Sequence, residues 1–297
     1  MVRLVTIDSP AKLNLHLDIL EKRGDGFHDL FSIFQMISLF DKIKLISTDK
    51  ENSCTIDGPF DFPQEENIMF KAVDLFRKAT SYKEGVKISI EKNIPEGGGL
   101  GGGSGNAASV LKALQLLSSI TLPKDELFSI AAELGSDVPF FCSTAAAVVS
   151  GRGEYIKPVK ARTDYHIILI IPGFSINTGQ AFRALTDYRL DHKPEFPLKN
   201  EEVLEMYEKK AVSQWKFYNS FLNCLKKEHN VLEHIVNLFY YSGADFAGMS
   251  GSGSVMFGIF SKQKDCISAS EKLSNTFGKT LFVNPLDTAT KAALQFS

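Results

Sequence analysis

A run of glycines is the strongest chemical signal in the chain. Between Gly97 and Gly105, only Leu100 and Ser104 are not glycine. Such a run exposes backbone N–H groups, tolerates positive φ and leads into the apolar stretch from Asn106, whose helical N-terminus would favour an anion. A flexible linker is the alternative, but linkers are seldom bracketed by a strand and a strongly apolar helix. The pattern therefore predicts a phosphate-binding loop.

Lys12 and Asp137 could neutralise phosphate or move a proton. Lys12 lies two residues before Asn14 on the polar side of an alternating strand, although a lone lysine is more often a solvated surface residue. Asp137 precedes Val138 and Pro139, and we expect the proline to force Val138 into an extended conformation. A carboxylate beside the apolar wall that follows could act as a base, or it could cap the next segment. The residues alone leave both interpretations open.

Two further clusters carry groups suited to ligands. Phe27 and His28 follow a Gly-Asp-Gly turn and offer an aromatic face and a ring that donates and accepts hydrogen bonds. A core phenylalanine beside an exposed histidine is equally compatible with this pattern. Gly251 and Ser252 lie in a Ser-Gly-Ser-Gly-Ser run before a strand, which is either a plain turn or a second rim around phosphates.

The order of elements positions these residues. Apolar alternation predicts strands at 2–8, 13–19, 42–48, 86–91, 166–171 and 255–260. In the strand 13–19, one face is core and the other is polar. Helical spacing predicts helices at 67–79, 106–118, 124–134, 231–241 and 265–276 and two more within 200–227. Gly135 ends one of these in the left-handed capping conformation, and 187–198 is the most loop-like segment.

Bulk composition narrows the class of function. The chain has 297 residues, 44% of them hydrophobic, which favours two lobes. Its 33 basic and 35 acidic side chains create no field that would hold a polyanion, so we expect no nucleic-acid partner. The longest aliphatic stretch, 167–171, is about a quarter of a membrane span, and the first residues lack a signal-peptide pattern. We expect no membrane partner and a cytoplasmic location.

Taken in order, five motifs resemble those of the GHMP kinases. They are Pro-Ala-Lys-Leu-Asn-Leu at 10–15, Gly-Asp-Gly-Phe-His at 24–28, the glycine-rich segment 94–108, Gly-Ser-Asp-Val-Pro-Phe-Phe at 135–141 and Met-Ser-Gly-Ser-Gly at 249–253. The glycine loop and the final cluster are typical of the whole family. The other motifs are similar to one branch, whose alcohol substrate carries a cytidine diphosphate group. The resemblance spans nearly the whole chain.

The resemblance implies a two-lobe α+β GHMP kinase fold, with a ribosomal-S5-like N-terminal lobe at 1–157 and a ferredoxin-like C-terminal lobe at 158–297. It implies an enzyme of isoprenoid precursor biosynthesis that phosphorylates the 2-hydroxyl of a cytidylated methylerythritol, with ATP as co-substrate and Mg²⁺ whose ligands it does not identify. We expect small-molecule substrates and a monomer or weak homodimer. The alternatives are another GHMP kinase, acting on mevalonate or homoserine, and a non-catalytic RNA-binding protein of S5-like fold, which the lack of basic excess disfavours.

The resemblance also implies roles for individual residues. Asp137 would be the base that accepts the hydroxyl proton, and Lys12 would hold that carboxylate ionised. ATP would contact Pro95, Gly97, Gly98, Gly99, Leu100, Gly101, Gly102, Gly103, Ser104, Asn106 and, near the adenine, Asn67. The alcohol substrate would contact Asn14, Phe27, His28, Thr178, Phe182, Gly251 and Ser252, with cytosine stacked between the two phenylalanines and hydrogen-bonded by His28.

Two positions depart from the family's pattern. Phe27 replaces the usual tyrosine, and Gly105 replaces a serine. Stacking survives the first change, whereas the second leaves one fewer hydroxyl for phosphate or metal. We expect the substitution Gly105→Ser, which restores that hydroxyl, to be tolerated.

Overall fold

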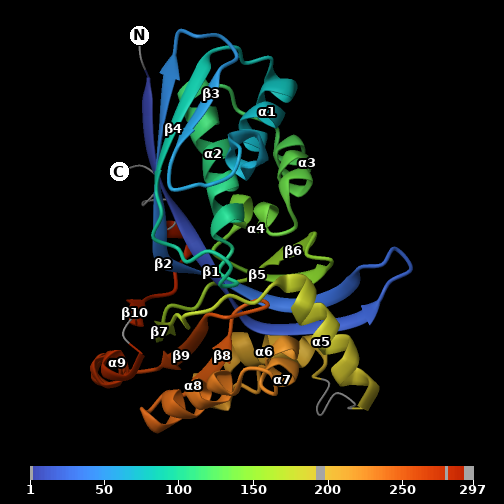
Figure 1. Ribbon diagram of the computed structural model, residues 1–297, viewed down its shortest axis with the longest axis vertical. Coiled ribbons are helices and arrows are strands. Elements are labelled where there is room, and N and C mark those ends of the chain that lie inside the picture. The colour runs from blue at the N-terminus through green and yellow to red at the C-terminus, as the bar shows by residue number, and fades with distance from the viewer. Residues whose placement is uncertain (1–2, 192–197, 278–279, 291–297) are drawn as a thin grey trace.

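Two long antiparallel strands run the length of the N-terminal lobe and reach the border with the C-terminal lobe (Figure 1). The computed structural model describes residues 3–191, 198–277 and 280–290. In it β1 spans Leu4–Lys22 and β2 spans His28–Thr48. The sequence predicts a break inside the first of these, but the structure continues through Pro10, which lies at a shift in strand register. Proline cannot donate a ladder hydrogen bond, and such shifts are where strands tolerate it.

The N-terminal lobe is a six-stranded sheet covered on one face by helices. Its order is β3-β4-β2-β5-β6, with β1 pairing to β2. The remaining strands are β3 (Cys54–Asp57), β4 (Gly85–Glu91), β5 (Ala146–Gly151) and β6 (Tyr155–Pro158). The helices are α1 (Ile68–Thr80), preceded by the 3₁₀ turn η1 (Gln64–Glu66), then α2 (Gly102–Ser118), α3 (Lys124–Leu134) and the short α4 (Val138–Ser143). Helices and sheet enclose one apolar core, in which Phe76 and Phe140 are fully buried.

The C-terminal lobe is built on a second, antiparallel sheet. Its strands are β7 (His166–Ile170), β8 (Phe246–Met249), β9 (Met256–Phe260) and β10 (Thr280–Val283), in the order β10-β7-β9-β8. Helices α5 (Thr178–Asp191), α6 (Asn200–Lys209), α7 (Ser220–Leu225) and α8 (Asn230–Tyr241), with the 3₁₀ turn η2 (Val212–Gln214), lie between β7 and β8. Helix α9 (Gln263–Phe277) lies between β9 and β10. This succession is that of a ferredoxin-like lobe, and the predicted α+β class is confirmed.

Several local expectations are wrong. Gly135 has φ 164° and ψ 156°, which is extended backbone and not the left-handed cap. Val138 is not extended but begins α4, because Pro139 stands in the first turn of a helix, where its missing N–H is not needed. The stretch 187–191 is the end of α5 and not a loop, while 192–197 lies outside the described residues.

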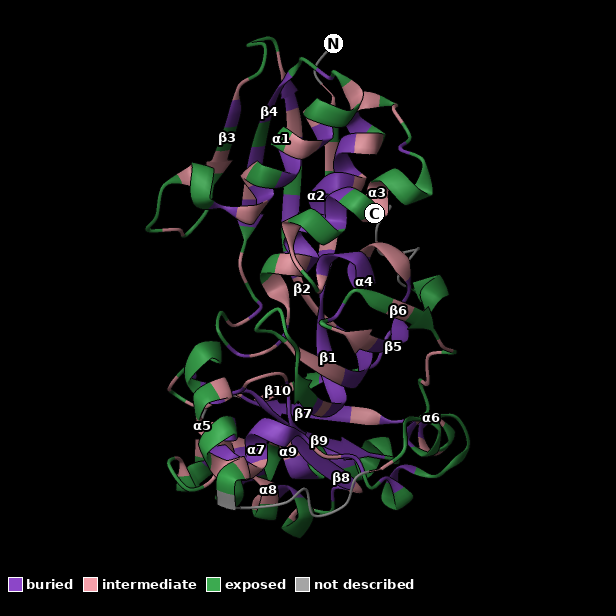
Figure 2. Ribbon diagram, turned by 90° about the vertical axis from the view of Figure 1, so that its right-hand side faces the viewer, coloured by how far each residue is buried: buried purple, intermediate pink, exposed green. Residues whose placement is uncertain are grey.

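Buried residues follow the two sheets and the inner faces of their helices (Figure 2). On β1 the polar face is as buried as the apolar one, since Lys12, Asn14 and His16 are all 4% exposed or less. Alternation thus predicts the two faces correctly, but both are covered. Within the described residues, no helix is long and apolar enough to cross a membrane.

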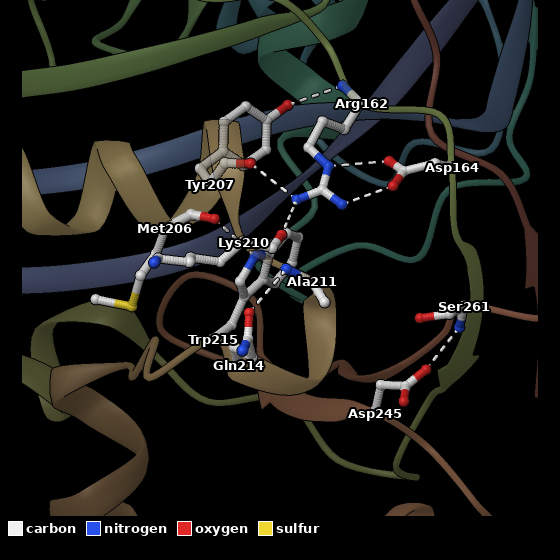
Figure 3. A network of polar contacts seen from close by, with 10 residues as sticks. All are labelled: Arg162, Asp164, Met206, Tyr207, Lys210, Ala211, Gln214, Trp215, Asp245 and Ser261. Carbon is white, nitrogen blue, oxygen red and sulfur yellow. Dashed lines mark hydrogen bonds and ion pairs between the residues drawn. The ribbon is translucent and has the colours of Figure 1, made fainter.

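Polar contacts join the segment between β6 and β7 to both lobes. The Arg162 guanidinium donates to the carbonyl oxygens of Tyr207 (2.9 Å) and Lys210 (2.6 Å) and pairs with Asp164 (Figure 3). The Tyr207 hydroxyl in turn donates to Gln35 Oε1 on β2 at 3.0 Å. We propose 1–157 and 158–297 as the main body of each lobe, because this division falls one residue before the end of β6 and the segment that follows is anchored to the second lobe.

The end of the described chain returns to the first lobe. Gln35 Nε2 donates to the carbonyl oxygens of Met36, Ala145 and Leu286, and the Leu286 N–H donates to Met36 O at 2.9 Å. Leu286 also belongs to the core of the N-terminal lobe. The first lobe therefore includes a contribution from beyond β10.

Candidate active site

The glycine loop connects β4 to α2, which begins within the glycine run and not at Asn106 as the sequence predicts. Positive φ occurs at Gly97 (66°), Gly99 (76°) and Gly101 (69°), so only part of the run uses the freedom that glycine allows. A Cβ atom at Gly99 would lie 2.0 Å from the carbonyl oxygen of Ser250. Glycine is therefore required there for both backbone conformation and close packing.

A cavity of about 470 Å³ lies along this loop. Its lining includes every residue predicted to contact ATP: Asn67, Pro95, Gly97, Gly98, Gly99, Leu100, Gly101, Gly102, Gly103, Ser104 and Asn106. The N-terminus of α2 also points into this region, and helix N-termini favour anions. The structure thus brings the predicted phosphate-binding residues together around one space.

Sequence reasoning misses seven residues that line this cavity: Phe60, Phe62, Glu66, Ile68, Met69, Lys92 and Glu96. Phe60 and Phe62, whose ring centroids are 5.4 Å apart, form an aromatic part of its wall, and Lys92 adds a cation. Neither phenylalanine belongs to a periodic element, so no sequence pattern marks them. Asn67 has a structural task as well, because its Oδ1 accepts the Met69 N–H at 2.9 Å and caps α1. Within the described residues its side-chain N–H₂ group has no hydrogen-bond acceptor, so it can donate to a ligand.

Lys12 and Asp137 lie together beside the tip of the glycine loop. The Lys12 Nζ is 3.5 Å from Asp137 Oδ2 and donates to Asn14 Oδ1 at 2.5 Å. A Cβ atom at Gly101 would lie 3.1 Å from the Lys12 side chain. Burial lowers the pKa of Lys12 from its usual value, while the Asp137 carboxylate acts to raise it. The lysine is therefore a buried group paired with a carboxylate and not the solvated surface residue that the sequence alone suggests.

The position of Asp137 separates its two interpretations. It stands at the N-cap of α4, yet its side chain makes no capping hydrogen bond. The carboxylate instead faces Lys12 and keeps 28% of its side-chain surface exposed. A partly exposed carboxylate held by a buried ammonium is suited to accept a proton from a ligand, so the capping alternative is not supported.

The third glycine cluster connects the loop with the polar face of β1. The Ser250 hydroxyl donates to Gly99 O at 2.9 Å and accepts from the Asn14 N–H at 3.2 Å. A Cβ atom at Gly251 would lie 3.0 Å from the Cα of Gly99. Ser252 pairs its hydroxyl with Thr178 at 3.0 Å. The cluster is thus more than a plain turn, because it holds together three separate parts of the predicted site.

A second cavity, of about 580 Å³, lies where the β1–β2 hairpin meets α5. Phe27, His28, Thr178 and Phe182 line it, as the resemblance implies, although no local pattern predicts α5 itself. The His28 ring stacks on Phe182 with centroids 5.3 Å apart, and its Nδ1 lies 3.2 Å from Leu20 O. One face of Phe182 is thus already occupied by His28, so cytosine could stack on that face of Phe182 only after His28 turns.

Arg152 covers one face of Phe27. Its guanidinium carbon lies 4.4 Å from the ring centroid, and the residue Phe27 is 56% exposed. Arg152 belongs to the turn between β5 and β6 and is not among the described residues that line the cavity. The guanidinium therefore covers one face of Phe27 from outside the cavity lining, and the other face is available for stacking.

The expectation for Gly105 is wrong. A Cβ atom at this position would lie 2.7 Å from the carbonyl oxygen of Pro10, closer than real Cβ contacts come to backbone. Gly105 is where α2 packs against β1, so restoring serine would push the two elements apart. The departure from the family's pattern thus has a packing reason in this chain.

Comparisons with known proteins agree with this geometry. The GHMP kinases N terminal domain matches residues 67–145. A relative from Thermodesulfovibrio yellowstonii, named 4-diphosphocytidyl-2-C-methyl-D-erythritol kinase, is 33% identical over 88% of this chain and 92% of its own length. A crystal structure of 4-(cytidine 5'-diphospho)-2C-methyl-D-erythritol kinase matches with TM-score 0.77 and 31% identity over 96% of this chain and 99% of its own. A homoserine kinase from Cytophaga hutchinsonii has TM-score 0.71 at 14% identity, covers 96% of this chain and 95% of its own, and shows a shared fold.

Proposed function

This chain belongs to the 4-diphosphocytidyl-2-C-methyl-D-erythritol kinases of the GHMP kinase family, and from that premise we propose that it transfers the terminal phosphate of ATP to the 2-hydroxyl of 4-diphosphocytidyl-2-C-methyl-D-erythritol. It is a small-molecule kinase of isoprenoid precursor biosynthesis. The observation that carries the proposal is the Lys12–Asp137 contact at the tip of the glycine loop. Neither rival GHMP substrate, mevalonate or homoserine, has a base to place in the second cavity.

Phosphoryl transfer depends mainly on placement and charge neutralisation. We propose that Asp137 accepts the proton of the substrate hydroxyl, while Lys12 orients the carboxylate and neutralises charge beside the transferred group. The glycine loop would hold the phosphates through its backbone N–H groups and the N-terminus of α2. The contacts of Ser250 and Gly251 with Gly99 support this arrangement. Because the Ser250 hydroxyl also accepts the Asn14 N–H, these contacts fix the loop relative to Asn14 and Lys12.

Mg²⁺ is proposed to enter with ATP. The described residues contain no group of three or more His, Cys, Asp and Glu side chains that could hold a metal ion. Mg²⁺, however, usually keeps several waters and binds phosphates plus one or two protein oxygens. The buried Oδ1 of Asn106 has no hydrogen-bond partner in the described structure, and with the Ser104 hydroxyl it offers such oxygens along the nucleotide cavity. When bound, the cation would neutralise charge on the phosphates.

The cytidine group is proposed to bind in the second cavity. Phe27 presents an open face, and Thr178 connects this cavity to Ser252 of the third glycine cluster. We propose that His28 turns from Phe182 as the base enters and then hydrogen-bonds its edge. A turn that keeps the contact of Nδ1 with Leu20 O would leave Nε2 as the ring nitrogen that reaches the base.

A substrate panel tests the proposal. Purified protein would be incubated with ATP and, separately, the cytidylated methylerythritol, mevalonate, homoserine and galactose, and ADP release would be measured. We expect turnover with the first alone and inhibition of that turnover by CDP. Turnover with mevalonate or homoserine instead, or failure of CDP to compete, would contradict the assignment of the second cavity to cytidine.

A further inference from the structure

Asp41, on β2, is a buried carboxylate to which the proposed mechanism gives no role. It is 0% exposed. Its Oδ1 accepts the backbone N–H groups of Asn93 at 2.7 Å and Ile94 at 2.8 Å. Its Oδ2 accepts from Asn106 Nδ2 at 2.9 Å and contacts the ammonium of Lys92. Both oxygens are therefore fully used by donors from outside its own strand.

These donors come from both ends of the glycine loop. Asn93 and Ile94 lie immediately before the loop, whereas Asn106 lies in α2 after it. Bonding both ends to one carboxylate on a strand fixes the distance between them and removes conformational freedom from the loop. A buried carboxylate is costly unless it is paired and hydrogen-bonded, so these contacts are expected to form together.

The same carboxylate orients a cation at the start of α2. The Lys92 side chain is 11% exposed, and its Nζ lies 3.6 Å from the place of a Cβ atom at Gly102, the first residue of α2. An ammonium at a helix N-terminus reinforces the attraction of that terminus for an anion. Within the described residues, Asp41 is the one ion-pair and hydrogen-bond partner of Lys92, so it holds the ammonium in this place.

We propose that Asp41 is a positioning residue that clamps the glycine loop in the shape that receives the phosphates of ATP. The proposal rests on the proposed function only for the identity of the ligand. Asp41 touches neither substrate and acts through the loop and Lys92. Its effect should therefore fall on the nucleotide and not on the cytidine group.

The test is Asp41→Asn, which keeps the size of the side chain and removes its charge. In the ligand-free protein, we expect amide hydrogen exchange in 93–106 to become at least about ten-fold faster, because the loop ends are released. Calorimetry should show ATP binding about ten-fold weaker and CDP binding changed by less than about two-fold. Because exchange needs no substrate, this clamp is tested even if the protein phosphorylates none of the proposed alcohols.

Two further variants make the test decisive. Asp245→Asn is the matched control, since Asp245 Oδ2 accepts the Ser261 N–H at 2.7 Å and closes a turn in the other lobe (Figure 3). It should leave exchange in 93–106 and both affinities as in the wild type. If Asp41→Asn does not fold, Asn106→Ala removes one donor and should still accelerate exchange in this segment. Wild-type exchange in the folded variants, or equal loss of ATP and CDP affinity in Asp41→Asn, would overturn the proposal.

Discussion

The two cavities of this protein are built in opposite ways. The nucleotide cavity is formed mostly by backbone, from one continuous loop and the start of one helix, and buried hydrogen bonds to Asp41 and Ser250 hold it. The second cavity is formed by side chains from the β1–β2 hairpin and α5, two elements that are far apart in the sequence. Its aromatic rings are partly exposed, and His28 already stacks on Phe182.

This difference matches what each cavity is proposed to bind. The phosphates of ATP carry no base-specific features to be recognised, so a fixed set of backbone N–H groups suits them. A base is recognised by stacking and by its hydrogen-bonding edge, which requires side chains that can adjust. The pair proposed to react, Lys12 and Asp137, lines neither cavity and lies beside the tip of the loop.

The largest expected effect belongs to that pair. Asp137→Asn should lower turnover by at least about 100-fold, because it removes the proton acceptor, while ATP and CDP still bind. Steady-state kinetics and calorimetry measure the two quantities. Lys12→Met combined with Asp137→Asn should be strongly non-additive, since both act on one proton transfer. Near wild-type turnover in Asp137→Asn would remove this residue from the mechanism.

The pH profile gives an independent view of the same pair. Burial lowers the pKa of Lys12, so its ammonium should lose its proton at a lower pH than an ordinary lysine, whose value is 10.5. Turnover should therefore fall on the alkaline side before pH 10.5 is reached. In Lys12→Met this alkaline limb should be missing from the residual activity. An unchanged limb in this variant would assign it to another group.

Glycine substitutions should next sharpen the description of the nucleotide cavity. Gly99→Ala combines positive φ with a Cβ atom 2.0 Å from Ser250 O, so ATP affinity should fall by about ten-fold or more. Gly103→Ala is the matched control, because its φ is not positive and its Cβ atom would meet only Ile68, at 4.0 Å. Calorimetry with ATP distinguishes them. Equal losses of ATP affinity in the two variants would mean that the glycines matter because the ligand approaches them closely, and not because of their backbone conformation.

Aromatic substitutions should affect only the second cavity. Base stacking on an aromatic side chain is worth about 1 to 3 kcal/mol, so Phe27→Ala or Phe182→Ala should raise the KM of the alcohol substrate about ten-fold. The KM of ATP should hardly change. Phe27→Tyr keeps the stacking face and should be nearly neutral. His28→Ala should lose the preference for CDP over UDP as a competitor, and retained preference would show that another group recognises the base.

The smallest expected effect concerns Arg152. A cation over an exposed ring contributes about 0.5 to 1 kcal/mol, so Arg152→Gln should raise the KM of the alcohol substrate by about two- to five-fold without changing turnover. In the Phe27→Leu background the same change should have no effect, because the ring is gone. A similar loss in both backgrounds would mean that Arg152 contacts the substrate directly.

Sequence reasoning succeeds where local spacing encodes backbone geometry. The glycine run leads to a loop whose predicted residues all line one cavity. It fails where distant segments decide the outcome. Alternation along β1 separates the two faces, but it cannot show that the polar one is also covered, because the glycine loop, which is distant in sequence, packs beside Lys12. Asp41 lies about 50 residues before the loop it holds, and no motif marks it.

Substitution rules transferred from the family fail for a similar reason. Serine at 105 is compatible with the motif but not with the Pro10 carbonyl oxygen beside it in this chain. The N-terminal part of α5 carries Thr178 and Phe182, yet it has a weakly apolar pattern, and only the resemblance predicts these residues. Where contacts between separate segments decide, a pattern in one segment is not enough.

The return of Leu286 to the first lobe has a consequence for folding during synthesis. Domains generally fold as units, the N-terminal one first, as the chain leaves the ribosome. Here Gln35 and Met36, near the middle of β2, form hydrogen bonds to a residue made only after the whole second lobe. The N-terminal lobe can collapse early, but its last backbone hydrogen bonds must wait. Completion of the first lobe is therefore coupled to that of the second, which favours a single cooperative unfolding transition over two separate ones.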